Sequence, residues 1–168
     1  MATALTILHE EHRSILAVLH GLDYLVQTVR VLRKAVEPRV FQAMLYYLDT
    51  FSERMHHPKE DRYLFAAMRS RSREAGAIVE ELEREHAGGA AALRELEQAL
   101  IRYEEGGSKE FPAFAKAVEA FTSGYWDHMQ KEEETAFPLA EKVLGEEDWK
   151  EIDRAFEENR DPLADQRE

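Results

Sequence analysis

Residues 41–65 read FQAMLYYLDTFSERMHHPKEDRYLF, and this stretch decides the fold. Its apolar residues recur every three or four positions, which is the spacing of one face of an amphipathic α-helix. They are Phe41, Met44, Leu45, Leu48, Phe51 and Met55. We expect a helix from Pro38 to about Met68, with a kink or a tightened turn just after His57, because Pro58 lacks a backbone donor.

The same periodicity predicts three further long helices, and no strand pattern competes with it. We expect them over Ala4 to about Lys34, Ile78 to Gly106, and Pro112 to about Glu134, with the polar stretch 69–76 as an interruption. A short segment to Leu144 and an amphipathic segment over Asp148–Phe156 follow. The sequence therefore predicts an all-α, up-down-up-down antiparallel four-helix bundle over residues 1–145, then a short C-terminal helix and a frayed tail over residues 146–168.

Composition excludes several classes of protein. The 168 residues carry a net charge of −12, so neither nucleic acid nor an anionic membrane is an expected partner. With no cysteine, disulfides, thiolate nucleophiles and iron–sulfur clusters are excluded, and any metal must be held by His and carboxylate. The first twelve residues carry no basic patch, and the apolar run Ile15–Leu19 is far too short to cross a membrane. We expect a cytoplasmic protein.

A two-fold internal repeat selects the polar residues of the apolar faces. His56 and His128, 72 positions apart, are each followed by Glu four residues later and by Phe nine residues later. The pairs Glu11-His12 and Glu85-His86 match with an offset of 74. Stacking two such halves would bring six side chains into one bundle core: His12, His56, Glu60, His86, His128 and Glu132. Unpaired, these groups would be costly to bury, so the pattern predicts that they bind metal.

Other histidines compete for the same role, although a lone His on an apolar face is more often a hydrogen-bonded core residue. The counterpart of His57 is Met129, so we expect His57 at the surface or beside the ligands. His9, one turn before His12, is a possible fifth ligand. His20 lies too far along the helix to share the site. Whether His9 or His57 adds a ligand stays open.

A ferritin-like alternative rests on the Glu-x-x-His spacing of Glu53–His56 and Glu83–His86. It leaves His12 and His128 unused, so we favour the repeat-based set. Tyr125, one turn before His128, is the aromatic residue that we expect nearest the metals.

The four motifs together resemble the hemerythrin HHE cation-binding domain, over roughly Leu5 to Leu144. They are Glu11-His12, His56 to Phe65, Glu85-His86 and His128 to Pro138. The resemblance implies a non-haem di-iron site in which both Glu bridge two irons, each iron takes two His, and a solvent-derived bridge completes the centre. Zn or Mn could substitute, since imidazole and carboxylate suit all three metals.

The oxygen-carrying hemerythrins have a fifth His at the position of Ala90 and an Asp at that of Glu133. The four-His, two-Glu set is instead similar to bacterial iron-centre repair proteins, without their cysteine-bearing N-terminal segment.

Our leading interpretation is a di-iron protein that binds or senses O2, NO or peroxide, or handles iron under oxidative or nitrosative stress, and we favour this over an enzyme without deciding the question. It follows from the open coordination position that such a ligand set leaves on each metal. Two alternatives stay open: a di-iron oxidase or NO or peroxide reductase, and a purely structural metal site.

Overall fold

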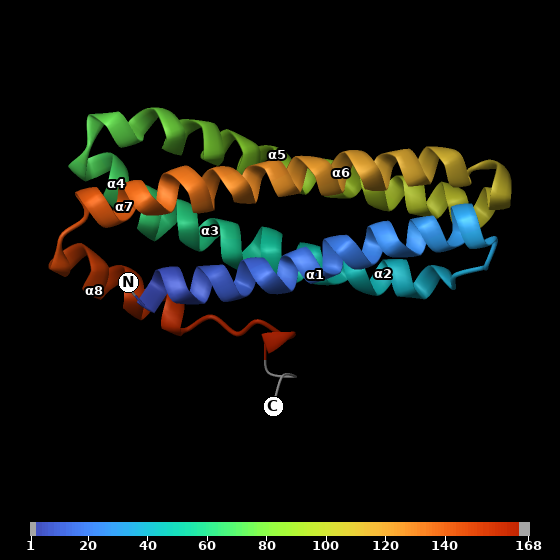
Figure 1. The fold of residues 1–168 in the computed structure, drawn as a ribbon, viewed down its shortest axis with the longest axis horizontal. Helices are drawn as coiled ribbons and strands as arrows, with labels where there is room; N and C mark the ends of the chain where they lie inside the picture. Colours follow the sequence, from blue (N-terminus) through green and yellow to red (C-terminus); the bar gives the residue numbers. More distant parts are fainter. Residues whose placement is uncertain (1–2, 165–168) are drawn as a thin grey trace.

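The computed structural model describes residues 3–164, and the regular elements of that part are all helices. Four long helical runs lie side by side along the longest axis of the molecule (Figure 1). The first is α1 (Thr3–Leu32) and the third is α5 (Arg73–Gly106). The second comprises α2 (Pro38–Tyr47), η1 (Leu48–His56), α3 (His57–Lys59), η2 (Glu60–Phe65) and α4 (Ala66–Arg71). The fourth comprises α6 (Phe111–Lys131), η4 (Glu132–Ala136) and α7 (Phe137–Val143). The predicted all-α class is confirmed.

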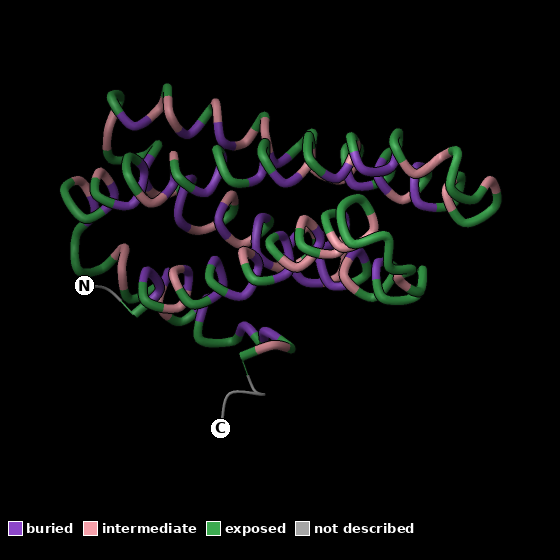
Figure 2. The backbone as a smooth tube through the Cα atoms, turned by 45° about the vertical axis from the view of Figure 1, so that its right-hand side comes forward, coloured by how far each residue is buried: buried purple, intermediate pink, exposed green. Residues whose placement is uncertain are grey.

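Two short elements complete the chain: η3 (Gly107–Lys109), which leads into α6, and α8 (Glu146–Glu157), which packs on α1. Every long run buries one stripe and exposes the other, as the buried and exposed stretches of the tube in Figure 2 show. This is the pattern that the apolar periodicity predicts.

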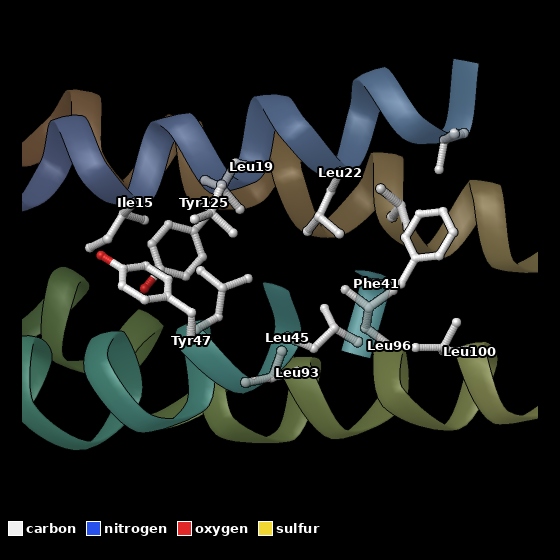
Figure 3. Close-up of a cluster of buried hydrophobic side chains, with 14 of the residues drawn as sticks. Ile15, Leu19, Leu22, Phe41, Leu45, Tyr47, Leu93, Leu96, Leu100 and Tyr125 are labelled. Carbon is white, nitrogen blue, oxygen red and sulfur yellow. The ribbon is translucent and has the colours of Figure 1, made fainter. Parts of the chain in front are cut away.

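The buried apolar residues form two clusters, separated by a polar layer. One cluster takes its side chains from residues 15–26, 41–51, 93–100 and 114–129, and part of it is drawn in Figure 3. The other takes them from 4–8, 64–68, 75–82 and 136–156. In every run the predicted ligands lie between the two clusters. The apolar residues therefore fix the bundle on both sides of the site.

The second run widens just before the place where we expected a kink or a tightened turn, and the fourth run widens in the same way before Pro138. Backbone N–H groups of His57 and Phe137 donate to carbonyls five residues earlier, those of Ser52 and Glu132, within π-helical segments. Each donor residue directly precedes a proline, whose ring would collide with the carbonyl four residues earlier in a regular α-turn. The wide turn therefore precedes Pro58. Just after His57 the backbone N–H of Glu60 donates to the carbonyl of His57, three residues earlier, which is the tightened turn that we expected, and the run continues through it.

The polar stretch 69–76 interrupts the helices more briefly than predicted. The break lies at Ser72, whose extended backbone separates α4 from α5 and whose hydroxyl accepts from the N–H of Ala75 at 3.3 Å. A side-chain N-cap of this kind satisfies a donor that the helix itself leaves free, so α5 begins well before Ile78.

The C-terminal residues also differ from the predicted frayed tail. Ile152 and Phe156 of α8 are buried in the second cluster, and the following residues Asn159 and Asp161 are buried as well. Hydrogen bonds described below hold this segment although its composition is charged. Residues 165–168, the end of that predicted tail, lie outside the described residues.

Within residues 3–164, α1 is the one helix long and apolar enough to cross a membrane by length and composition alone. Core helices pass the same test, and α1 buries polar side chains such as His12 together with Leu5 and Leu8. The finding is weak evidence for a membrane span.

Candidate metal centre

All six predicted ligands converge in the polar layer between the two apolar clusters. Each is at most 7 % exposed: His12, His56, Glu60, His86, His128 and Glu132. They come from all four helical runs, so the site exists only when the bundle is assembled. Burial of so many ionisable groups is costly unless they are paired or coordinate a cation.

The carboxylates of Glu60 and Glu132 lie at the centre of the layer. One oxygen of Glu60 lies 3.9 Å from Nε2 of His12. The other lies 3.5 Å from Nε2 of His56 and 3.6 Å from Nε2 of His86. One oxygen of Glu132 lies 3.3 Å from Nε2 of His12. The other lies 3.5 Å from Nε2 of His86 and 3.3 Å from Nε2 of His128. Each carboxylate therefore faces histidines of both halves, which is the placement that a bridging ligand needs.

The donor atoms of this layer lack hydrogen-bond partners. Nε2 of His12 and His56 and all four oxygens of Glu60 and Glu132 are buried without one. Nε2 of His86 lies 2.9 Å from Nε2 of His128, so two ring nitrogens point at one place. Convergent lone pairs and buried carboxylates satisfy one another when a cation lies among them, so the residues fit the metal that the resemblance implies.

His57 joins the site, and its alternative placement at the surface was wrong. It is 4 % exposed, and its ring stacks on that of His86 with centroids 4.1 Å apart. Ring nitrogens of His57, His86 and His128 lie within 4.8 Å of one another, and we call these three the three-histidine group. The same holds for donor atoms of His12, His56, Glu60 and Glu132, which we call the two-carboxylate group.

Successive helical side chains point about 100° apart, so His56 faces one group while His57 faces the other. The repeat could not reveal this, because the second half has Met129 at that position. The absence of a histidine at Ala90 was the available signal, since a fifth imidazole could then come from another helix.

A second layer of four carboxylates surrounds the histidines. Each accepts a hydrogen bond from an Nδ1 atom: Glu133 from His12 at 2.8 Å, Glu11 from His56 at 2.7 Å, Asp61 from His86 at 2.7 Å, and Glu85 from His128 at 2.8 Å. We call Glu11, Asp61, Glu85 and Glu133 the outer carboxylates. An Nδ1–H held in this way leaves Nε2 with its lone pair aimed inward, which is how proteins prepare a histidine for a metal.

The outer carboxylates follow the internal repeat. Glu11 and Glu85, each directly before the first-helix histidine of its half, accept from the His-x-x-x-Glu histidine of the same half. Asp61 and Glu133, each directly after the ligand glutamate, accept from the first-helix histidine of the other half. The motifs Glu-His and His-x-x-x-Glu-acid therefore encode both layers, although sequence reasoning assigned a role to the inner one alone.

A family model described as the hemerythrin HHE cation binding domain matches residues 3–140. The protein belongs to the hemerythrin HHE family. No curated protein and no solved structure matches the chain. The hemerythrin domain binds cations, and the His and Glu cluster of this chain is compatible with a di-iron site.

Charges within this hemerythrin site are strongly coupled. Burial and the neighbouring charge of Glu132 raise the pKa of Glu60 well above its usual value. Burial acts in the same direction on Glu132, but the charge of His128 and the nearby rings of His12 and His86 outweigh it and hold the pKa of Glu132 well below its usual value. The two carboxylates are therefore shifted in opposite directions, and Glu60 is the one that holds a proton more readily.

Two histidines of the hemerythrin site are strongly basic. Burial disfavours charge on His12, but the nearby carboxylate of Glu132 and the hydrogen bond that the ring donates to Glu133 raise its pKa to about 9. Burial is likewise outweighed at His86, where Asp61 and Glu132 raise the pKa to about 9.

The remaining candidate ligands lie outside both groups. Nδ1 of His9 is 3.3 Å from an oxygen of Glu133, and His9 belongs to neither group. His20 is exposed and stacks on Trp126 with ring centroids 6.0 Å apart. Glu83, required by the ferritin-like alternative, pairs with Arg69 at the surface.

Tyr125 lies beside the three-histidine group, where we expected it. Its hydroxyl is 2.9 Å from Nε2 of His57 and also contacts Ser52 Oγ. A carboxylate oxygen of Glu53 lies 3.5 Å from that hydroxyl and 3.5 Å from Nδ1 of His57. Burial raises the pKa of Glu53 to about 7, so this carboxyl gains and loses its proton near neutral pH.

A cavity of about 290 Å³ opens on the three-histidine group between α5 and α6. Small residues form its sides: Gly88, Gly89, Ala92, Ala120 and Gly124. His57, His86, His128 and Tyr125 also line it. Because glycine and alanine leave room between the two helices, a small molecule can reach the histidines without a change of fold.

Proposed function

We propose that the two groups hold two iron ions and that the protein binds or senses a small ligand such as O2, NO or peroxide, or handles iron under oxidative or nitrosative stress. The observation that carries this proposal is the set of buried donor atoms without hydrogen-bond partners, contributed by both halves. Five imidazoles and two carboxylates suit iron, and Zn or Mn are possible substitutes. When bound, such a centre supplies redox chemistry and an open coordination position.

The cavity between α5 and α6 supports the binding of an external ligand. A purely structural site is closed by its own ligands, whereas this cavity is lined by the side chains of the three-histidine group. Its apolar sides would admit small neutral molecules and restrict bulk water. Tyr125 Oη and the protonated Glu53 carboxyl offer hydrogen-bond donors beside His57.

The alternative is a di-iron oxidase or an NO or peroxide reductase. Glu53 and Tyr125 favour it in one respect, because together they could hold and deliver a proton at the cavity. This reading requires an external electron donor, and we place it second for that reason.

The proposal also includes the connectivity of the helices, the absence of polyanionic partners and the location of the protein. The order of colours along the four runs in Figure 1 supports the up-down-up-down connectivity. The net charge of −12 supports the exclusion of nucleic acid and anionic membranes as partners. We also propose a cytoplasmic location.

Anaerobic reconstitution with Fe(II) tests the function directly. We expect the protein to take up two irons and to show new absorption on addition of NO or O2, while His56→Ala takes up less iron. Absence of iron uptake by the wild-type protein would contradict the proposal. Sustained turnover with a chemical reductant and peroxide would favour the enzymatic alternative.

Filling the cavity tests the ligand route. Gly124→Leu should slow the spectral change on addition of NO and leave the iron content unchanged. Ser123→Leu is the matched control, because Ser123 directly precedes Gly124 on α6 but lines a different groove, beside α1. Equal rates in the two variants would remove the cavity from the proposal.

A further inference from the structure

The C-terminal segment, residues 158–164, lies beyond the part of the chain matched to the hemerythrin domain, yet it reaches the metal centre. Nδ2 of Asn159 donates to Oε1 of Glu11 at 2.7 Å. The other oxygen of Glu11 accepts from Nδ1 of His56 at 2.7 Å. Two successive hydrogen bonds thus connect the segment to a histidine of the two-carboxylate group. In Figure 1 the end of the chain returns beneath the N-terminal part of α1.

Independent contacts hold this segment in place. Tyr47 Oη donates to Oδ1 of Asp161 at 3.0 Å, and the backbone N–H of Leu163 donates to the same oxygen at 2.9 Å. Leu163 also packs against the apolar cluster that contains Tyr47. Just before the segment, Nζ of Lys59 donates to the carbonyl of Ala155 at 2.7 Å. Asn159 is therefore fixed by its neighbours on both sides and is buried against Glu11.

The equivalent carboxylate in the other half has a different partner. Glu85, which accepts from Nδ1 of His128, is also bound by the ammonium of Lys131. Its side chain is 34 % exposed, whereas that of Glu11 is 3 % exposed. Burial would raise the pKa of Glu85, but Lys131 and His128 outweigh it and lower the value.

These partners change what each outer carboxylate does to its histidine. An ammonium neutralises part of the charge of Glu85, so its hydrogen bond from His128 is weakened. A neutral amide orients Glu11 without removing its charge, and a buried carboxylate with its full charge is a strong acceptor. A stronger acceptor at Nδ1 makes the imidazole a better electron donor at Nε2.

We propose that Asn159 is a positioning residue of the metal centre, which orients Glu11 and through it strengthens the hydrogen bond from His56, so that the two cations are held unequally. This inference rests on the proposed two-metal site. It assigns the C-terminal segment a role beyond covering α1, namely setting the donor strength of one ligand.

Imidazole NMR of the metal-free protein tests the inference without relying on metal. Asn159→Leu keeps the size of the side chain and removes the donor, and it should shift the Nδ1–H resonance of His56 while that of His128 stays unchanged. Lys131→Met is the matched variant in the other half and should give the reverse pattern. Tyr47→Phe removes one contact of the same segment without touching Glu11, so it should shift the His56 resonance less than Asn159→Leu does.

Metal release gives a second readout. With iron or zinc bound, we expect Asn159→Leu to accelerate loss of one cation to a chelator by about tenfold, the lower end of what loss of a partner outside the ligand set costs. A His56 resonance and a release rate equal to those of the wild type would overturn the inference. If no cation binds at all, the proposed function fails while the NMR comparison still decides the role of Asn159.

A measurement on the wild type keeps the test valid if Asn159→Leu does not fold. The Nδ1–H of His56, covered by the C-terminal segment, should exchange with solvent more slowly than that of His128. Equal or faster exchange at His56 would contradict the proposed hydrogen-bond chain.

Discussion

The two-carboxylate group and the three-histidine group are built from the same repeated sequence pattern, but their surroundings differ. Each uses one first-helix histidine and one His-x-x-x-Glu histidine, and each has its pair of outer carboxylates. The three-histidine group adds His57 and opens to a cavity, whereas the two-carboxylate group is backed by the C-terminal segment. The repeat thus defines where cations bind, and residues outside it make the two positions unequal.

Replacing Glu132 should have the largest effect, because it would break both groups at once. Glu132 faces histidines of each half, so Glu132→Ala removes one of the two carboxylates that connect them and the one nearest His12 and His128. We expect loss of both cations in metal analysis after reconstitution. Glu133→Gln, one residue later, should keep measurable metal content with affinity reduced by roughly 10- to 100-fold, because it removes only a partner of His12. Full metal content in Glu132→Ala would show that the groups are independent.

Removing His57 should separate the two groups. We expect His57→Ala to weaken cation binding at the three-histidine group by at least roughly 100-fold, since the loss of a ligand exceeds the loss of an outer partner. The other group keeps all its ligands, so titration followed by metal counting should find one tight position and one weak position. His9→Ala is the control and should leave both positions tight. Two tight positions in His57→Ala would place His57 outside the ligand set.

The metal-free protein should lose stability as the pH rises from 7 to 9. His12 and His86, one in each group, have pKa values of about 9 in the folded state against 6.5 when unfolded. Groups with raised pKa values stabilise the fold fully below the unfolded value and lose that contribution as the pH passes the folded value. We expect the Tm, measured by circular dichroism, to fall by roughly 10 °C over this range.

The metal-loaded protein should show a smaller dependence, because its ligands are already deprotonated. The burial of His56 and His57 lowers their pKa values, and that contribution is already complete above pH 6.5. A metal-free Tm that rises between pH 7 and 9 would contradict this assignment.

The smallest expected effect concerns the glycines of the cavity. A Cβ atom at Gly88 or Gly124 would meet no atom within 4 Å, so Ala at either position should stabilise the protein by about 0.5 to 1 kcal/mol through helix propensity. At Gly89 the Cβ would lie 2.5 Å from a carboxylate oxygen of Glu53, so Gly89→Ala should give no gain. Chemical denaturation can measure these differences. An equal gain at all three positions would indicate that Glu53 moves freely.

Much of the fold and the inner ligands could be predicted from the sequence, because both follow periodic rules. Apolar spacing located the helices, and the match between the halves selected His12, His56, His86 and His128 with their glutamates. The role of His57 stayed open, because a repeat argument gives no support to a residue without a counterpart.

The C-terminal segment was missed for a different reason. Its charged composition indicated a solvated tail, but Asn159 pairs with Glu11, 148 positions earlier in the chain. A contact across that distance leaves no periodic trace. Composition also treats Asp161 as solvated, although the fold buries it against Tyr47.

The wide turns before Pro58 and Pro138 have a consequence for how such a centre tolerates change in its chain. A π-turn accommodates one residue more than an α-turn over a similar length of helix. Deleting a single residue within η1 would therefore return that turn to α-helical geometry, while the residues on either side keep their orientation toward the two groups. The cost would be the clash of the Pro58 ring with the carbonyl of a regular α-turn, not a change in which cation each imidazole faces.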